Sequence, residues 1–327
     1  MSRIPPYLHR LSIPTPFPVG PVNVYVVEEE DGLSLIDVGP RFDPARERLR
    51  EGIAALGYRL HDVRRIVLTH VHSDHAGMAA EVVEASGARV LTHPLNFPEL
   101  ADYAAERERR LAFYAALMQE AGMPPEAMAQ IAAARREYGR FAQAVRPDHP
   151  LEDGATVRLG GEPWQVLHTP GHTGGLICLY QPERRLLLSS DHLLRDVSSN
   201  PIVEPPREEG EPRPKRLLDY LAQLERVAEM DVDLALPGHG PLITDVKGLI
   251  ERRLSFHRQR ARGVLKVLGD GERSAYEISL ALFPDLDPIN RFLAVSEVIG
   301  HLDWLEEEGR VTSRMDGSIR RWVRKAG

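Results

Sequence analysis

Short apolar runs alternate with amphipathic stretches along the first third of the chain. Four runs rich in β-branched residues predict strands, at 22–29, 32–39, 64–69 and 89–93. Residues 44–57 and 76–86 are rich in helix formers, and Gly57 and Gly87 close these stretches as helix stops. Strands and helices therefore alternate as β-α-β-α-β, which favours a layered α/β fold.

Residues 97–145 break this alternation. They are rich in Ala, Arg, Glu and Met, carry spaced aromatic residues, and are interrupted by GMPPE at 122–126, so they predict two helices. Aromatic and Met stripes usually belong to a core, which favours a helical pair packed on the rest of the molecule. The alternative is a lid over a substrate pocket, because long insertions in compact domains are often functional.

The β pattern returns after Pro150. The runs TVRL, WQVLHT, LICLY and RRLLLSS are separated by Gly and Pro turns and predict a second set of strands. Two β-rich halves flanked by helical stretches favour two packed sheets. Residues 198–216 follow this half, and their prolines and charges predict a loop.

The last part of the chain has a different order of elements. From residue 246, three helical stretches precede RVTSRMDGSIRRWVR, which predicts a hairpin turning at Asp316 and Gly317. Three helices followed by a hairpin is the order of a winged helix. We therefore expect two domains, residues 1–245 and 246–327, in keeping with a chain of 327 residues.

Composition narrows the class of protein. The chain is 43% hydrophobic and 27% charged, as in ordinary globular proteins, and its net charge of −7 gives no sign of nucleic-acid binding. The single cysteine, Cys178, cannot form an internal disulfide and is expected to be a buried apolar residue. The N-terminal segment lacks the apolar core of a signal peptide, and no apolar run reaches the ~18 residues of a membrane span. A cytoplasmic protein without membrane contact is expected.

The C-terminal segment carries a mild excess of positive charge. Residues 250–327 hold 14 basic and 12 acidic side chains, a net charge of +2. The basic residues gather toward the end of the chain: Arg310, Arg314, Arg320, Arg321, Arg324 and Lys325. This excess is well short of a basic recognition domain, so packing on the first domain or formation of a homodimer is favoured over nucleic-acid binding.

The densest chemical signal is THVHSDHAG at residues 69–77. His70 and His72 lie two positions apart at the end of a predicted strand, so both side chains can reach one metal ion. Asp74 and His75 follow where the chain turns toward a helix, and they can address a second ion. Imidazole nitrogens and carboxylate oxygens suit a dinuclear site, whose ions lie ~3.5–4 Å apart.

Three further candidates lie in loops that follow or join apolar runs. His172 lies in HTPGHTGG, Asp191 follows LLLSS, and His239 lies in the Pro/Gly turn of LALPGHG. Loops at one rim of a rigid sandwich are where binding and catalytic residues collect. For His93 and His168 a structural role is favoured over one that braces the site, and His192, beside Asp191, is expected either to brace the site or to belong to the core.

The order HxHxDH, a lone His, a lone Asp and a His in GHG resembles the metallo-β-lactamase fold superfamily, from LSLIDVG at residue 33 to residue 239. The resemblance implies a four-layer αβ/βα sandwich with two divalent metal ions, Zn²⁺ being favoured over Fe or Mn. It implies one ion on His70, His72 and His172, and the other on Asp74, His75 and His239. Asp191 would bridge the two ions, and Asp37 would brace the site. Ser190 stands where many members have Gly, and its small size predicts little consequence.

The resemblance also implies a hydrolase. Water on Zn²⁺ has its pKa lowered from 15.7 to about 7, and the resulting hydroxide attacks an electrophilic carbon or phosphorus. Asp74 and Asp191 are the expected catalytic carboxylates, Asp74 because it can orient the nucleophile and Asp191 because it bridges the metals.

The substrate is less constrained than the site. Taken as a whole, the chain resembles the branch of the superfamily that couples this sandwich to a C-terminal winged helix. That branch includes bacterial hydrolases of unassigned substrate, polyketide thioesterases and an endoribonuclease. A small-molecule thioester or ester is the favoured substrate and predicts an apolar pocket under residues 97–145. The alternative, a ribonuclease or phosphodiesterase that holds nucleic acid on the winged helix, predicts an arginine-lined groove from the metals to the hairpin. A non-catalytic nucleic-acid-binding protein and a single-iron persulfide oxidase are minor alternatives.

Overall fold

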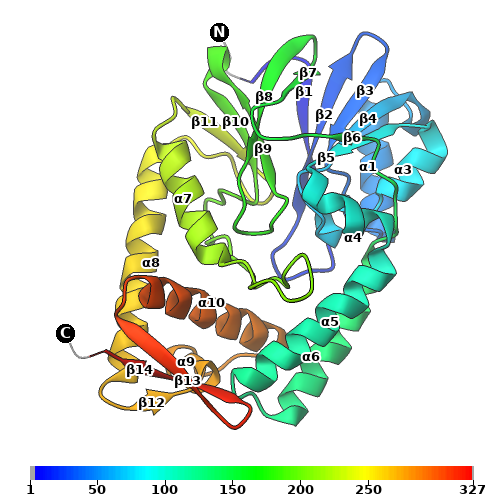
Figure 1. The fold of residues 1–327 in the computed structure, drawn as a ribbon. Coiled ribbons are helices and arrows are strands. Elements are labelled where there is room, and N and C mark those ends of the chain that lie inside the picture. The colour runs from blue at the N-terminus through cyan, green and yellow to red at the C-terminus, as the bar shows by residue number, and fades with distance from the viewer. Residues whose placement is uncertain (1–3, 326–327) are drawn as a thin grey trace.

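The computed structural model describes residues 4–325. In the first half of the chain six strands form one sheet, in the order β1-β2-β3-β4-β5-β6 (Figure 1). Their bounds are Leu8–Ile13, Val22–Glu29, Gly32–Ile36, Val63–Val67, Arg89–Thr92 and His149–Pro150. Strands β1 to β3 pair antiparallel, whereas β3 to β6 are parallel. The C-terminal ends of β3, β4 and β5 therefore meet at one edge of the sheet.

Five further strands form a second sheet, in the order β11-β10-β9-β8-β7. From β7 to β11 their bounds are Thr156–Leu159, Glu162–His168, Ile177–Gln181, Leu186–Ser190 and Leu234–Pro237. Strands β10 and β11 are parallel, and the other neighbours pair antiparallel. The expectation of two sheets is confirmed.

The two sheets pack face to face. Their inner faces share one hydrophobic core, to which Val67 of β4 and the fully buried Trp164 of β8 both belong. Helices α1 and α3 pack on the outer face of the first sheet, and α7 and α8 on that of the second. These four helices span Asp43–Ala55, Ala79–Ser86, Arg216–Ala228 and Val246–Leu268. The predicted alternation of strands and helices in the first third of the chain is confirmed, with two additions: β1 (Leu8–Ile13), where the sequence analysis predicts no strand, and a separate short helix, α2 (Ser73–Ala76), before α3.

The insertion forms the two predicted helices, α5 (Tyr103–Glu120) and α6 (Pro125–Tyr138), after a short helix α4 (Phe97–Ala101). Asp102 begins α5, since its carboxylate accepts a hydrogen bond from the backbone N–H of Ala105 at 3.1 Å. None of the described helices is both long and apolar enough to cross a membrane.

After α8 the chain forms the expected helices and hairpin. In chain order the elements are β12 (Glu272–Arg273), α9 (Ala275–Leu282), α10 (Pro288–Glu307), β13 (Val311–Asp316) and β14 (Ile319–Arg324). The predicted hairpin is present, but its two turn residues are Gly317, with a φ of +60°, and Ser318, one position later than expected, because Asp316 still pairs with Ile319. The three strands form a small sheet in the order β12-β14-β13.

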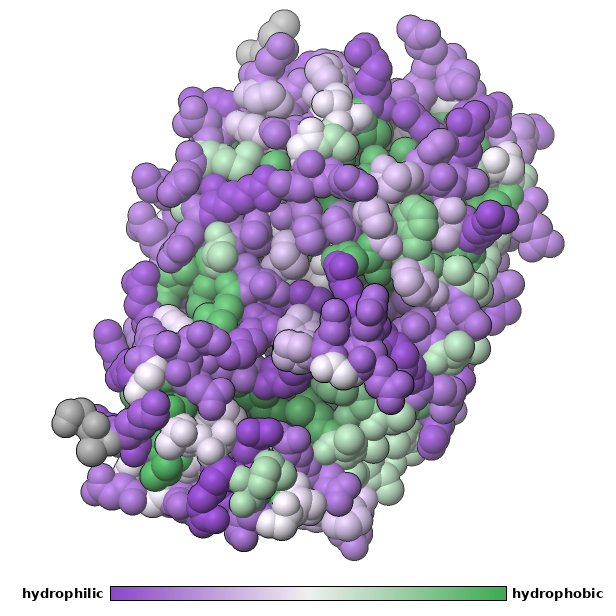
Figure 2. Space-filling view, in the orientation of Figure 1, coloured by the Kyte–Doolittle hydropathy of each residue, from purple (hydrophilic) through white to green (hydrophobic). Residues whose placement is uncertain are grey.

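The insertion and the C-terminal elements share one hydrophobic core. Tyr114 and Phe292 meet ring to ring with centroids 4.9 Å apart, and Trp322 belongs to the same core. Arg135 of α6 lies over both rings, at 4.4 Å from Tyr114 and 4.5 Å from Phe292. The visible face is mainly hydrophilic, with an apolar area in the lower part, where these elements meet (Figure 2). The helical pair therefore packs on the C-terminal segment, a partner that no periodicity in the sequence identifies.

Candidate metal centre

The seven proposed ligands lie where strands of both sheets end. His70 and His72 follow β4, and Asp191 and His239 follow the neighbouring parallel strands β10 and β11. His172 lies in the turn between β8 and β9. The structure brings all seven together in three overlapping groups, and the ligand atoms of each group lie within 4.8 Å of one another.

The first group consists of His70, His72 and His172. The Nδ1 of His72 lies 3.1 Å from the Nε2 of His70 and 2.9 Å from the Nε2 of His172. The Nδ1 of His172 donates to the carbonyl oxygen of Asn200 at 3.2 Å, so its Nε2 carries a lone pair. Burial lowers the pKa of all three rings, and that of His72 to about 3. Neutral imidazoles facing one another in this way suit a metal ion.

The second group consists of Asp74, His75 and His239. The Nε2 of His239 lies 3.3 Å from Oδ2 of Asp74. The Nδ1 of His239 donates to the carbonyl oxygen of Pro21 at 2.9 Å, which points Nε2 into the cluster. Burial favours a raised pKa for Asp74, but the neighbouring His239 and His75 rings outweigh it and lower this pKa to about 2. Asp74 is therefore a carboxylate at neutral pH.

Asp191 lies between the two groups. Its Oδ1 is 3.4 Å from the Nε2 of His75, and its Oδ2 is 3.6 Å from the Nε2 of His172 and 3.7 Å from that of His239. Burial opposes positive charge on His75, but the Asp191 and Asp37 carboxylates outweigh burial and raise the pKa of this ring. The carboxylates thus favour positive charge at the centre of the cluster.

Buried atoms without hydrogen-bond partners show that these residues fit a metal ion. Among the described residues they include Nε2 of His75, Oδ1 of Asp191 and Nε2 of His239. Buried polar atoms are nearly always paired, so three unpaired ones at the same place call for a missing partner. A divalent cation would satisfy all three atoms, and imidazole with carboxylate suits Zn²⁺, Fe or Mn.

The chain matches the Metallo-beta-lactamase superfamily over residues 17–239. It belongs to that superfamily. It is 36% identical over 308 residues to the Probable metallo-hydrolase YqjP of Bacillus subtilis, covering 94% of this chain and 95% of that one. A metallo-beta-lactamase family protein of Thermus thermophilus has the same fold, with a TM-score of 0.84 at 30% identity over 98% of this chain and 99% of the other. Human Acyl-coenzyme A thioesterase MBLAC2 is 35% identical over 101 residues, 30% of this chain and 33% of that protein. The expectations of a metallo-β-lactamase fold and of a metal-dependent hydrolase are confirmed.

Asp37 contacts His75, one of the proposed ligands of this metallo-hydrolase. Its carboxylate accepts hydrogen bonds from the backbone N–H of Thr69 at 2.8 Å, from the Thr69 hydroxyl at 2.8 Å and from Nδ1 of His75 at 2.7 Å. Ser190 joins this network, because its Oγ lies 2.8 Å from Oγ1 of Thr69. Ser190 also has a φ of +45°, the left-handed region that favours glycine. The expectation that Ser190 has little consequence considers only its size, and so misses its hydrogen bond to Thr69 and its left-handed backbone. Thr69 is also assigned no role by the sequence analysis.

The remaining candidates, His93, His168, His192 and Cys178, are packed against other parts of the protein. His93 and His168 stack with ring centroids 3.8 Å apart, and Nε2 of His168 donates to the carbonyl oxygen of Gly174 at 2.8 Å. His192 is buried edge-to-face against Tyr220. Burial raises the pKa of the Cys178 thiol to about 12, so it remains protonated and is unsuited to ligate a metal or attack a substrate.

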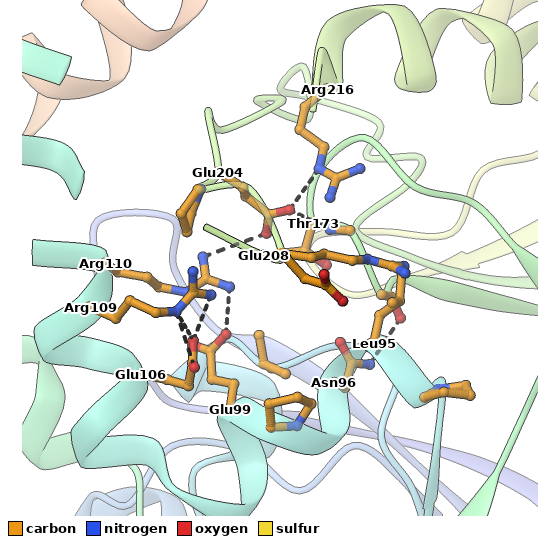
Figure 3. Close-up of a pocket in the computed structure, with 17 residues that line it drawn as sticks. Leu95, Asn96, Glu99, Glu106, Arg109, Arg110, Thr173, Glu204, Glu208 and Arg216 are labelled. Atoms are coloured by element: carbon orange, nitrogen blue, oxygen red, sulfur yellow. Dashed lines mark hydrogen bonds and ion pairs between the residues drawn. The ribbon is translucent and has the colours of Figure 1, made fainter. Parts of the chain in front are cut away.

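A cavity of about 340 Å³ adjoins the loop that carries His172. Its wall comes from the start of the insertion, from residues 173–175 and from residues 204–208 (Figure 3). Apolar side chains line part of it, but so do four arginines and four glutamates: Arg109, Arg110, Arg207, Arg216, Glu99, Glu106, Glu204 and Glu208. The thioester hypothesis predicted an apolar pocket under the insertion. A cavity does adjoin the start of the insertion, but charged side chains line much of it.

Proposed function

We propose that this metallo-hydrolase is a dinuclear enzyme that cleaves a small-molecule thioester or ester in the cytoplasm. The observation that carries the proposal is the presence of two three-residue groups on either side of Asp191, whose carboxylate oxygens lie 3.4–3.7 Å from ring nitrogens of both groups. Two ligand groups that share one carboxylate are what two ions ~3.5–4 Å apart require. Zn²⁺ is the favoured ion, and Fe or Mn could occupy the same ligands.

The protein residues have separable tasks in the reaction. When bound, two such ions lower the pKa of a water to about 7 and polarise a carbonyl oxygen. Asp74 keeps its side chain 14% exposed at the cluster surface, so its carboxylate can accept a hydrogen bond from the attacking water and orient it. Asp191 is 5% exposed and remains ionised, which keeps a negative charge between the two ligand groups. No Ser or Cys nucleophile is needed.

The cavity beside His172 supports a small substrate. It is large enough for a drug-sized molecule, since ligand pockets usually span about 300–1,000 Å³. The name of the human relative, an acyl-coenzyme A thioesterase, favours thioester chemistry. The charged lining favours a polar acyl group over a long alkyl chain, because an alkyl chain would desolvate these charges without replacing their hydrogen bonds.

A ribonuclease is the weaker alternative. Arginines of the β13–β14 hairpin already have carboxylate partners: Arg314 with Glu272, Arg320 with Glu120 and Arg321 with Glu277, at 2.5–2.7 Å. Charges neutralised in this way attract phosphates less. The proposal therefore includes the C-terminal segment as a winged helix that packs on a four-layer αβ/βα sandwich, or joins two copies in a homodimer, rather than one that holds nucleic acid.

The test compares two substrates on one preparation. Purified protein with quantified metal is offered an acyl thioester and a phosphodiester, with chelator-treated protein as the control. We expect about two metal equivalents per chain and a chelator-sensitive thioester rate that exceeds the phosphodiester rate. A dominant phosphodiester rate would reverse the choice of substrate, and thioester cleavage that survives chelation would reject the metal-dependent mechanism.

A further inference from the structure

The loop at residues 198–216 contains a buried carboxylate that no motif singles out. Glu204 is 6% exposed, and its Oε2 accepts hydrogen bonds from the backbone N–H of Gly174 at 3.0 Å and from Nε of Arg216 at 2.6 Å. Its Oε1 lies 3.5 Å from Nη1 of Arg110 (Figure 3). One carboxylate therefore joins the loop of His172 to two arginines on different helices.

The contact with Gly174 acts on a residue two positions from His172. A Cβ at Gly174 would lie 2.3 Å from Nη2 of Arg216 and 2.9 Å from Oε2 of Glu204, so glycine is what permits this approach. The carbonyl oxygen of Asn200 accepts from the His172 ring at 3.2 Å. The 198–216 loop thus holds the His172 loop at two points, one on the ring and one on the backbone.

The contact with Arg110 extends to the helical insertion. Arg110 of α5 is also bonded to Glu99 of α4, with Nη2 and Oε2 2.6 Å apart. On the other side, Nη1 of Arg216 donates to Asp219 at 2.8 Å. Five alternating charges, which we call the Glu204 network, consequently link the insertion to the loop of His172 and to α7: Glu99, Arg110, Glu204, Arg216 and Asp219.

We propose that Glu204 is a positioning residue that fixes His172 for metal binding by holding the backbone N–H of Gly174. This inference rests on the proposed function, in which His172 is a ligand of one ion. The Glu204 side chain supplies two things: an acceptor for the backbone N–H of Gly174, and a negative charge for Arg110 and Arg216. The two requirements can be separated by substitution.

The test uses the full chain with metal removed and Co²⁺ added back, since the visible spectrum of Co²⁺ reports its ligands. Glu204→Ala should weaken by about 10–100-fold the binding of the ion held by His172, the usual effect of losing a residue that orients a ligand, and leave the other ion bound. Glu204→Gln keeps an acceptor for Gly174 and should retain affinity within about threefold of wild type, a rescue that a purely electrostatic role would not give. Glu209→Gln, an exposed position of the same loop that does not line the cavity, is the matched control.

A third substitution at Glu204 keeps the inference testable if Glu204→Ala does not fold. Glu204→Asp keeps the charge for the arginines but is one methylene too short to reach Gly174, so it should fold and still show the loss at one ion. Folded Glu204→Asp and Glu204→Ala proteins with wild-type affinity and spectrum for both ions would overturn the inference. If wild-type protein binds only one ion or none, the proposed dinuclear function fails first, and the inference fails with it.

Discussion

The substitution Asp37→Asn should weaken metal binding without unfolding the protein. Asp37 is 2% exposed, and its carboxylate accepts from the Thr69 backbone, the Thr69 hydroxyl and the His75 ring at 2.7–2.8 Å. In the variant the amide oxygen must face the Thr69 backbone N–H, because the amide NH₂ there would set donor against donor. The NH₂ group then faces Nδ1 of His75 and donates to it. His75 consequently carries its proton on Nε2, the atom that faces Asp191, and cannot bind a metal through it.

The expected size of this effect follows from the same contacts. Losing the partner that fixes a ligating histidine costs about 10–100-fold in metal affinity, or about 1.4–2.7 kcal/mol. Folding should change less, because asparagine has nearly the same volume. Thr69 can also accept from the new amide while donating to Ser190, whose Oγ lies 2.8 Å away.

Metal titration against a chromophoric chelator measures the affinity, and thermal unfolding of the same samples verifies the fold. The control is Asp231→Asn, which removes a carboxylate that is 84% exposed. Wild-type affinity for both ions in folded Asp37→Asn protein would refute the argument from the tautomer. An equal loss of affinity in Asp231→Asn would assign the effect to overall charge.

Three further outcomes are expected. Asp191→Ala should lose most activity together with bound metal, because its carboxylate lies between both ligand groups; full activity in an assay with metal quantified would reject the bridging role. Burial lowers the pKa of His257 to about 3 and that of His301 to about 4. Below about pH 6.5 the unfolded chain therefore binds protons that the folded chain does not, so the free energy of unfolding decreases as the pH is lowered. Urea unfolding should show this slope reduced by up to about 1.4 kcal/mol per pH unit in His257→Gln, and an unchanged slope would contradict a neutral buried ring. With one leaving group held constant, a hydroxylated short acyl thioester should be cleaved faster than a decanoyl thioester, and the reverse order would show that the charged cavity does not receive the acyl group.

That the seven proposed ligands would lie together could be predicted from the sequence because of where they stand relative to apolar runs. His70 comes soon after β4 of the first sheet and Asp191 directly after β10 of the second, and loops that follow strands collect at one rim of a rigid sandwich. Which ring nitrogen of each histidine faces the cluster could not be predicted. The ring orientation of His172 depends on the carbonyl of Asn200, and that of His239 on the carbonyl of Pro21, in segments without periodic pattern. Backbone carbonyls are the same in every residue, so the sequence carries no signal for them.

The partners of surface elements were also beyond the sequence. Periodicity shows which face of a helix is apolar but not what covers it, so the pairing of Tyr114 with Phe292 had no signal. The same holds for Glu204, one of many acidic residues in a loop, whose burial between two arginines depends on how three distant segments meet. Charge and proline content predicted the loop, but they could not indicate that one of its carboxylates is buried and paired.

The shared core of the insertion and the C-terminal segment predicts that residues 1–245 alone will not behave as a stable domain. Removing residues 246–327 would uncover Tyr114, Leu117 and Met118, all buried in that core, at about 1.5–3 kcal/mol for each fully exposed side chain. The truncated chain should therefore aggregate or bind a hydrophobic dye, as measured by sedimentation and fluorescence. A truncated chain in which these three residues are replaced by glutamine should be more soluble, because it presents the same helices without the apolar face. A soluble, monomeric 1–245 fragment with the metal content of the full chain would instead support the boundary expected from the order of elements, and would limit the shared core to an interface between independent domains.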